Sequence, residues 1–386
     1  MKYKNYKLEE LATIKYGKNQ KKVISDNGHI PIYGTGGLMG YATEALYDKP
    51  SVLIGRKGTI EKVRYVTHPF WTVDTLFYTI IQDNIVLPHY LYYLMSLLDL
   101  KKFNEGTTIP SLRTETLNRI EFNVPELEYQ SKVLSILEPI EEKIDTNNLI
   151  NKNLEEQIQV LCRSWLIDYA PFGYERPDTW SVVSLSSIAD FVSGYSYKGT
   201  ELVESDIAMA TIKNFDRKGG FKLDGYKEIQ PSTKLKPEQH AELFDTLVAH
   251  TDLTQNAEVI GNAEPVLSFS GYRDIVFSMD VVKVLPKDGI SKFLLAALLQ
   301  DGRFKAHALG YVNGTTVLHL SKKALPEFEL PLPSDLDELA PLANAVEAMY
   351  RQIANNIDES TQLAKLRDSL LPQLMSGEMD VSNIDL

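Results

Sequence analysis

Residues 104–112 read NEGTTIPSL, and residues 312–320 read VNGTTVLHL. The tripeptide Gly106-Thr107-Thr108 therefore returns as Gly314-Thr315-Thr316, at an offset of 208 residues (314 − 106). Three such residues are common in turns, so the tripeptide alone is weak evidence for a repeat. The segments around the two copies decide whether the chain contains one unit twice.

Four more segments match in the same order on either side of the middle of the chain. They pair KLEELATIKYG (7–17) with SLSSIADFVSG (184–194), SVLIGRKGTIEKV (51–63) with DTLVAHTDLTQNAEV (245–259), FWTVDTLFYTI (70–80) with VFSMDVVKVLP (276–286), and the helical run 87–103 with 291–309. The third pair sets Asp74 opposite Asp280. We interpret the chain as two copies of an α/β (α+β) domain related by pseudo-twofold symmetry.

A long helical pattern follows each copy, at 133–165 and 342–374. Its apolar positions alternate between spacings of four and three, which is typical of a coiled-coil seam. The seam includes Leu137, Ile144, Asn147, Asn151, Ile158 and Trp165 in the first helix and Val346, Ile353, Asn356, Leu363 and Leu370 in the second. Polar residues in a seam lower stability but fix the register. We expect the two helices to pair as an antiparallel coiled coil. A dimerisation rod with no further role is the alternative.

Composition bounds the class of protein. The chain has 386 residues and a net charge of −12, which on average disfavours nucleic-acid binding. Residues 1–22, however, carry seven lysines against two glutamates, a local charge of +5. Cys162 is the single cysteine, so no disulfide within the chain is possible and a reducing, cytoplasmic setting is expected. We expect neither a signal peptide nor a membrane span.

No motif predicts catalysis. YGTGGLMG (33–40) lacks dinucleotide-binding spacing, and a turn in close contact with another group is the better interpretation than a nucleotide cradle. The seven histidines show no metal-ligand spacing, and the chain has no Asn-Pro-Pro-Tyr or Asp-Pro-Pro-Tyr stretch of the kind expected in an adenine methyltransferase. We therefore predict no catalytic residue, no metal site and no cofactor in this chain.

The polar loops, in contrast, suit DNA contact. Arg can bind guanine bidentately, Gln and Asn suit adenine, Asp can accept from cytosine, and Lys binds phosphate. Candidates in the first copy are Lys18, Lys21, Lys22, Tyr33, Thr35, Arg56, Lys57 and Thr59. Candidates in the second are Tyr195, Tyr197, Lys198, Lys213, Asn214, Arg217, His250, Thr251, Asp252, Thr254 and Gln255. Each of them could instead be a solvated loop residue.

Together these segments resemble the specificity subunit of Type I restriction–modification systems over essentially the full length. YGTGGLMGY, LIGRKGTI, FWTVDTLFY and GTTIPSL are similar to one target recognition domain of that family, and LVAHTDLTQNAEVIG and GTTVLHLS to a second. LCRSWLIDY and LRDSLLPQLMSGEM resemble the ends of its two conserved helical regions. The resemblance implies recognition domains at 1–125 and 171–333, with helical regions at 126–170 and 334–386.

The resemblance also implies function and partners. Each recognition domain would bind one half of a split target in double-stranded DNA, and the helices would space the halves. Two modification subunits would carry S-adenosylmethionine and methylate adenine, and restriction subunits would use ATP and Mg for cleavage. This chain would be a non-catalytic subunit of that complex.

Two other functions stay open at this point. The chain could carry methyltransferase or nuclease activity of its own, or it could be a coiled-coil interaction scaffold that does not bind DNA. For the repeated Gly-Thr-Thr we favour a structural turn between recognition domain and helix over contact with bases.

Overall fold

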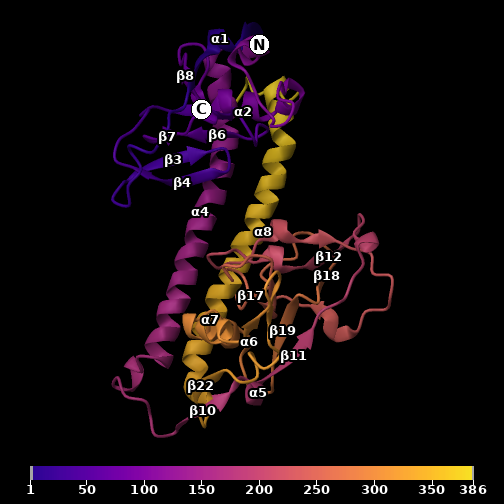
Figure 1. Cartoon of the computed structure of the whole chain (residues 1–386). Coiled ribbons are helices and arrows are strands. Elements are labelled where there is room, and N and C mark those ends of the chain that lie inside the picture. The colour runs from indigo at the N-terminus through magenta and orange to yellow at the C-terminus, as the bar shows by residue number, and fades with distance from the viewer. Residues whose placement is uncertain (1–2, 385–386) are drawn as a thin grey trace. The chain divides into compact units, whose positions relative to one another are not determined.

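The computed structural model describes residues 3–384 and divides into two compact units. Unit 1 contains the chain up to residue 142 and from residue 363 onward, and unit 2 contains residues 143–362. Each unit joins sheets and short helices to the ends of two long helices, α4 (Leu127–Leu166) and α8 (Ala340–Ser376), as Figure 1 shows. The predicted fold class, two α/β domains each followed by a long helix, is confirmed.

Unit 1 is built around a four-stranded and a three-stranded sheet, with strand orders β2-β8-β5-β6 and β4-β3-β7. Its elements are β1 (Tyr3–Lys7), α1 (Leu8–Leu11), β2 (Ala12–Tyr16), β3 (Ile30–Gly34), β4 (Gly37–Ala42), β5 (Ser51–Gly55), β6 (Val63–Val66), β7 (Trp71–Thr72), β8 (Leu76–Ile81), α2 (Pro88–Ser96), α3 (Thr114–Asn118) and β9 (Glu121–Pro125). All five residues of β5 are buried, which is expected of a central strand covered on both faces.

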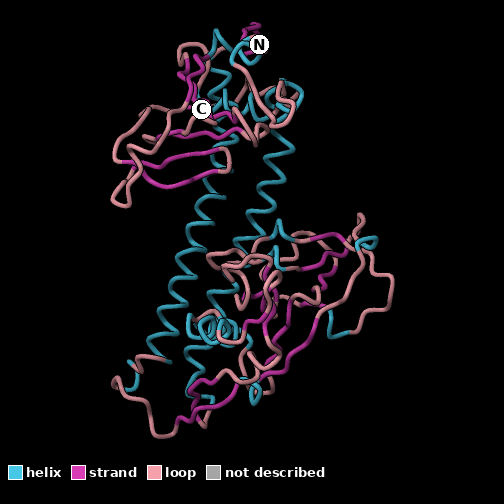
Figure 2. The backbone as a smooth tube through the Cα atoms, in the orientation of Figure 1, coloured by secondary structure: helices cyan, strands magenta, loops and turns pink. Residues whose placement is uncertain are grey.

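Unit 2 has the corresponding sheets β11-β19-β15-β17 and β13-β12-β18-β14, and a smaller sheet β16-β21-β20. Its elements are β10 (Trp180–Ser184), α5 (Leu185–Ile188), β11 (Ala189–Ser193), β12 (Ile207–Ala210), β13 (Lys227–Glu228), β14 (His240–Ala241), β15 (Thr246–Ala249), β16 (Thr251–Asp252), β17 (Ala263–Pro265), β18 (Asp274–Phe277), β19 (Val281–Pro286), α6 (Lys292–Leu299), α7 (Gly302–Leu309), β20 (Val312–Asn313), β21 (Leu318–Leu320) and β22 (Glu329–Pro333). Figure 2 shows these strands in magenta.

The duplication is visible in the strand pairing. The strand that opens each unit pairs antiparallel with the strand that precedes its long helix, β1 with β9 and β10 with β22. The second sheet of each unit also contains one parallel pair, β3 with β7 and β12 with β18. A side chain at Gly17 or Gly194 is excluded in the same way, because a Cβ would lie 2.0 Å from the Val73 oxygen or 2.2 Å from the Ser278 oxygen.

The pairing corrects one sequence alignment. Ala12 of β2 faces Ile81, and Ala189 of β11 faces Pro286, so β8 and β19 correspond at an offset of 205 residues (286 − 81). Asp74 therefore corresponds to Met279, and Asp280 corresponds to Thr75. Two apolar strands alone did not fix a register to one residue.

The two helical runs predicted at 87–103 and 291–309 are each interrupted. α2 ends at Ser96 and a 3-10 turn follows at Leu100–Phe103, whereas α6 gives way to α7. The Asp99 carboxylate accepts a hydrogen bond from the backbone N–H of Lys101, and the Asp301 carboxylate accepts one from Arg303. Each aspartate caps the start of the second segment, and this explains the break.

The seam residues of α4 and α8 are inside the helix packing. Leu137, Asn147, Ile158, Val346, Ile353 and Asn356 are buried, and Ile144, Asn151, Trp165, Leu363 and Leu370 are half-buried. The helices run antiparallel in each unit. In unit 1 Glu141 lies 3.6 Å from Arg367, and in unit 2 the Asn356 amide donates to Asn151 at 2.7 Å.

The asparagines form a polar layer in unit 2. The Asn147 amide nitrogen donates to the Glu359 carboxylate at 2.8 Å and to the Ser360 hydroxyl at 3.2 Å. The Gln352 amide donates to the Asn356 side-chain oxygen at 2.7 Å. The Gln352 bond lies within α8, but the bonds from Asn147 join α4 to α8 and form only when the two helices are aligned at this level, so the layer fixes their register.

His89 connects α2 to α4 in unit 1. Its two ring nitrogens lie 2.9 Å from a Glu138 oxygen and 3.1 Å from a Glu141 oxygen. The ring stacks against Tyr65 and Tyr93, with centroid distances of 4.5 and 4.6 Å. Burial lowers the pKa of His89, but the hydrogen bonds to Glu141 and Glu138 outweigh it, so the pKa is raised overall. An imidazolium, with two N–H donors, fits this site.

The corresponding position in unit 2 has no charge. Phe293 of α6 occupies the place of His89 and stacks on Tyr350 of α8, with ring centroids 6.5 Å apart. The same contact between short helix and long helix is therefore ionic in unit 1 and aromatic in unit 2.

We predict that His89→Phe removes a pH dependence of stability. The imidazolium stabilises the folded chain fully below the unfolded histidine pKa of about 6.5, and this contribution is lost as pH rises through the raised folded pKa. Its size is roughly 1.5–3 kcal/mol, the range for hydrogen bonds to charged groups. Urea unfolding between pH 6 and pH 8 measures it. His29→Phe, at an exposed histidine of the same unit, is the control. An unchanged pH slope in His89→Phe would contradict this account.

Candidate nucleic-acid interface

The loop that follows β5 in unit 1 has its backbone held from two sides. The N–H of Arg56 donates to the Thr75 oxygen at 2.8 Å, and the Arg56 oxygen accepts from the N–H of Leu112 at 2.9 Å. Gly58 has a φ of +88° and donates to the Pro110 oxygen at 2.9 Å. These bonds fix the main chain of the loop, so its side chains are presented from a rigid frame.

The candidate side chains of this loop are accessible. The Arg56 guanidinium lies 5.1 Å from the Tyr16 ring centroid and donates to the Asp74 backbone oxygen at 2.8 Å. Lys57 is exposed and Thr59 is half-buried. Arg56 is thus held in place while part of its donor fork stays free, whereas Lys57 is unrestrained.

The Gly-rich hairpin β3–β4 lies beside this loop. A Cβ added to Gly58 would be 3.9 Å from the Thr35 hydroxyl, which brings two predicted site residues close together. Tyr33 is half-buried under the Arg64 guanidinium, which lies 5.2 Å from its ring centroid. Arg64 was not among the residues predicted from the sequence, because it lies in the short strand β6 between apolar residues rather than in a polar loop.

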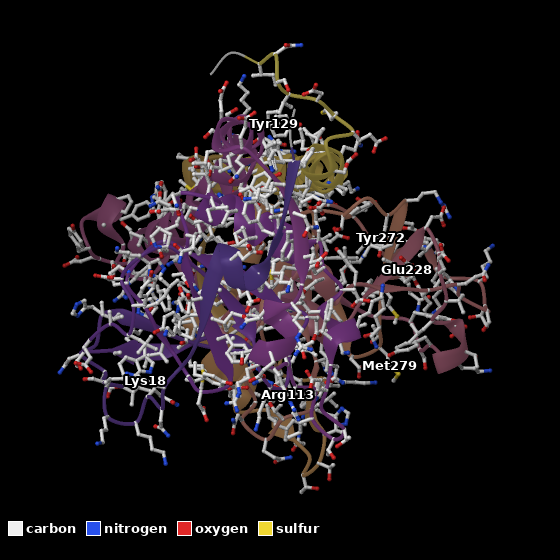
Figure 3. All side chains as sticks on the ribbon, turned by 90° about the horizontal axis from the view of Figure 1, so that it is seen from above. Lys18, Arg113, Tyr129, Glu228, Tyr272 and Met279 are labelled. Atoms are coloured by element: carbon white, nitrogen blue, oxygen red, sulfur yellow. The ribbon has the colours of Figure 1, made fainter. Side chains whose placement is uncertain are left out.

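Lys18, Lys21 and Lys22 are all exposed on the segment after β2. The backbone of Lys18 is fixed, since its oxygen accepts a hydrogen bond from the Trp71 indole at 2.9 Å, and Figure 3 shows its side chain at the edge of the molecule. The structure thus places these lysines where they can reach a phosphate backbone, and no carboxylate pairs with them among residues 3–384 at salt-bridge distance.

The corresponding loop of unit 2 has the same backbone frame. The N–H of His250 donates to the Asp280 oxygen at 2.8 Å, and the His250 oxygen accepts from Leu320 at 2.9 Å. His250 therefore occupies the position of Arg56. Burial lowers the pKa of His250, and the nearby His319 and Lys322 lower it further, so the ring is neutral near pH 7. It can exchange hydrogen bonds but contributes no charge.

Several candidates in unit 2 serve the fold instead. The buried Asp252 carboxylate accepts backbone N–H bonds from Thr254, Val259 and Ile260, at 2.8, 2.8 and 3.3 Å. The buried Thr251 hydroxyl donates to Asp280 at 3.2 Å. These two residues therefore leave the set of candidate base-reading residues, because their polar groups are already used inside the loop.

Asn214 and Tyr195 are corrected for the same reason. The fully buried Asn214 amide accepts from the Thr211 N–H and donates to the Lys222 oxygen, both at 2.8 Å. The buried Tyr195 hydroxyl donates to Glu201 at 2.7 Å. Asn214 and Tyr195 hold loops in place. Their neighbours Tyr197 and Lys198 are half-buried and exposed, respectively.

A pocket of about 340 Å³ brings several other candidates together in unit 2. Its lining includes Lys213, Arg217, Thr254 and also Lys222, which the sequence analysis did not select. Gln255 is exposed beside it, with its amide donating to the Thr315 backbone oxygen at 2.5 Å. The pocket lining carries three cations against the carboxylates of Asp224 and Asp252, together with the Thr254 hydroxyl. This excess of cations with a hydroxyl group suits a nucleic-acid backbone.

The repeated Gly-Thr-Thr forms a tight turn in both units. A Cβ on Gly106 would lie 1.9 Å from the Ile109 oxygen, and one on Gly314 would lie 2.2 Å from the Val317 oxygen. Gly314 also has a φ of +113°. The turn interpretation is supported, and the turn has a second role: the residues that follow it, up to Leu112 and Leu320, bind the backbone of the candidate loops.

Three further features of the described residues concern metal binding, the single cysteine and membrane insertion. Among residues 3–384 no three His, Cys, Asp or Glu side chains group as a metal site, and Cys162 is buried and free. No helix in this part of the chain combines the length and apolar character needed to span a bilayer.

Residues 1–156 match the family model described as Type I restriction modification DNA specificity domain. The chain is 24% identical over 356 residues to the Type I restriction enzyme MjaIX specificity subunit of Methanocaldococcus jannaschii, covering 88% of this chain and 80% of the relative. It is 22% identical over 381 residues to the HindI specificity subunit of Haemophilus influenzae, covering 80% of this chain and 81% of the relative.

Among solved structures, the Type I restriction–modification S subunit from M. genitalium has the same fold. It matches with a TM-score of 0.60 at 15% identity, over 97% of this chain and 96% of that chain. The family model over residues 1–156, the near full-length relatives and the duplicated fold agree with one another, and the chain is similar to the specificity subunits of Type I restriction–modification systems.

Proposed function

We propose that this chain is the sequence-specific DNA-binding subunit of a Type I restriction–modification complex, and that it recognises a split target with one half-site for each recognition domain. The proposed recognition domains are residues 1–125 and 171–333, and the helical regions are 126–170 and 334–386. One observation carries the proposal: two loops share the same backbone hydrogen bonds but present different side chains, Arg56 in one and His250 in the other.

The difference between the loops supports two unlike half-sites. Arg56 and Lys57 are cations that suit guanine and phosphate. The second loop offers a neutral His250 and the amide of Gln255, which suits adenine. Two loops with the same backbone hydrogen bonds but different side-chain donors and acceptors are expected to bind half-sites of different sequence.

Partner subunits supply the reactions in this proposal. Modification subunits carry S-adenosylmethionine and methylate adenine, and restriction subunits use ATP and Mg. Residues 126–145 carry six acidic side chains against two lysines, and two of the acids, Glu138 and Glu141, bind His89. The other four are exposed and give the first half of α4 an acidic surface on which these subunits would dock: Glu126, Glu128, Glu142 and Asp145. Such a face repels DNA and attracts a basic protein surface. We propose a cytoplasmic location for the complex.

Binding of random duplexes by the purified chain, repeated across salt concentrations, tests the proposal. A specificity subunit selects a sequence and shows a steep salt slope. A coiled-coil scaffold would show neither sequence selection nor a steep salt slope. A chain with its own methyltransferase activity would bind S-adenosylmethionine without a partner subunit.

We predict that Arg56→Ala and Lys57→Ala have different effects on DNA binding. Lys57→Ala should weaken all duplexes alike and lower the salt slope by about one, because a phosphate contact is lost. Arg56→Ala should relax the preference at one base pair and cost about 1–3 kcal/mol there. Binding selections with both variants measure this. Lys365→Ala, at an exposed lysine of α8, is the control for lost charge. Identical selections for all variants would exclude base reading by this loop.

We also predict that the helices set the distance between half-sites. Deleting residues 145–151 and 356–362 removes one heptad from each helix at matching levels and keeps the 4-3 spacing of the seam. It also removes the polar layer around Asn147, so thermal unfolding first checks that the shortened helices still pair. The shortening is about 10 Å, or about three base pairs of B-DNA, so the spacer of the methylated motif should shrink by about that amount. An unchanged spacer in the methylated DNA would show that the helices are not the ruler.

A further inference from the structure

The loop Asp216–Gly220 of unit 2 presents two exposed cations, Arg217 and Lys218, beside the 340 Å³ pocket. Its turn depends on Gly219 and Gly220, which have φ values of +95° and +102°. Two successive left-handed glycines form a flexible hinge, since glycine loses the most conformational freedom on ordering. Contacts with the rest of unit 2 must restrain the loop if Arg217 and Lys218 are to bind DNA in one defined geometry.

The Asp216 N–H donates to the Gly220 oxygen at 2.9 Å and closes the turn, and the Asn262 amide donates to the Asp216 oxygen at 2.9 Å at its first residue. One buried carboxylate holds the other end of the loop, at Gly220. Glu264 of β17 is 5% exposed, and one of its oxygens accepts the N–H of Gly220 at 2.7 Å. The other oxygen accepts the amide of Gln300 at 2.7 Å. Both bonds are charge-assisted and therefore stronger than those between neutral groups.

The chain of hydrogen bonds continues into the long helix. The Gln300 oxygen accepts the hydroxyl of Tyr350 at 2.6 Å, and Tyr350 is a fully buried residue of α8. Figure 1 shows α6, α7 and β17 beside this part of α8. Three consecutive bonds thus connect the tip of the loop, through Glu264 and Gln300, to the helix on which unit 2 is built.

We infer that Glu264 is a positioning residue for DNA recognition by unit 2, and that its carboxylate form holds the Arg217–Lys218 loop in the geometry that contacts the target. The inference rests on the proposed DNA-binding function. The inference gives Glu264 a role in recognition even though its side chain is buried. DNA recognition by unit 2 would then depend on this buried residue as well as on the exposed side chains of the site.

The groups around Glu264 make its proton state responsive. Burial raises the pKa of Glu264 to about 7, with further contributions from Glu155 of α4 and Asp216 of the loop, and against the hydrogen bonds from Gly220 and Gln300. Lys305 of α7 does not neutralise it, because its ammonium group donates to the Ile260 oxygen and to Asn262.

Other charged groups that line the same space as Glu264 are Lys152 and Glu156, which lie 3.9 Å from each other, and the exposed Lys218. Arg217 lies 3.3 Å from a Glu258 oxygen, and Tyr350 donates to Gln300 rather than to Glu264. A pocket of about 840 Å³, lined by the loop together with Glu264, Gln300 and Lys305, gives a path for protons. Above pH 7 both carboxylate oxygens accept hydrogen bonds. Below it one oxygen becomes an O–H donor, and either Gly220 or Gln300 loses its acceptor.

The test is Glu264→Gln in the full-length chain, with a duplex selected by the wild-type chain as the probe. Glutamine keeps one acceptor and replaces the other by an N–H₂ donor, so it imitates the protonated acid. We expect the variant to bind about fivefold more weakly at pH 8, the effect of one lost hydrogen bond, and to show no further loss at pH 6. The wild-type chain should lose about the same factor between pH 8 and pH 6.

Three comparisons separate positioning from general destabilisation. Thermal unfolding checks that Glu264→Gln is folded, and Tyr350→Phe, which breaks the far end of the chain of bonds, should weaken binding in the same direction. In an Arg217→Ala/Lys218→Ala background, Glu264→Gln should have no additional effect, because the loop has nothing left to position. Glu238→Gln, at an exposed glutamate of unit 2, is the control for lost negative charge and should leave binding unchanged.

The outcomes distinguish the two proposals. If the wild-type chain binds no duplex selectively, the proposed function fails. If it binds selectively but Glu264→Gln binds as tightly or more tightly at pH 8, or keeps the wild-type pH profile, the inference about Glu264 is wrong. Tighter binding by Glu264→Gln at pH 8 would mean that the loss of a negative charge near DNA outweighs the loss of loop positioning.

Discussion

In each unit, a pair of backbone hydrogen bonds clamps the loop that follows the central strand. Arg56 is bound by Thr75 and Leu112, and His250 is bound in the same way by Asp280 and Leu320. Because the clamp uses main-chain groups alone, the loop keeps its path whatever side chains it carries. The same backbone hydrogen bonds therefore present a charged side chain, Arg56, in unit 1 and a neutral one, His250, in unit 2.

The clamp needs the Gly-Thr-Thr turn, which explains why the tripeptide occurs twice. The turn at Gly106 or Gly314 reverses the chain so that Leu112 or Leu320 can reach the loop. The short helix before the turn then contacts the long helix, by a histidine ion pair in unit 1 and by an aromatic stack in unit 2. In each unit the recognition loop is thus bound to the turn, and the short helix before the turn is bound to the long helix. In unit 2 the bonds from Gly220 through Glu264 and Gln300 to Tyr350 connect a second loop, Asp216–Gly220, to the long helix.

Much of this architecture was predictable from the sequence. The repeated segments predicted two similar α/β domains. The alternation of four- and three-residue spacings between apolar positions predicted the long helices, because this periodicity is set by packing. The individual roles of Asn214 and Asp252 could not be predicted from the sequence. Both residue types suit base reading as well as loop stabilisation, and the path of the loop decides between the two roles. Glu264 gave no signal at all. It lies in a three-residue strand, and an acidic residue there is usually solvated. Arg64 was missed because it lies in the short strand β6.

The central claim is that one chain carries two different readers for one split target. Sequencing the methylated positions in DNA from a host that carries this chain and its modification partner tests that claim most directly. The account predicts a motif with two unlike specific halves separated by a spacer of fixed length and arbitrary sequence. A single continuous motif, or two halves of the same sequence, would contradict it.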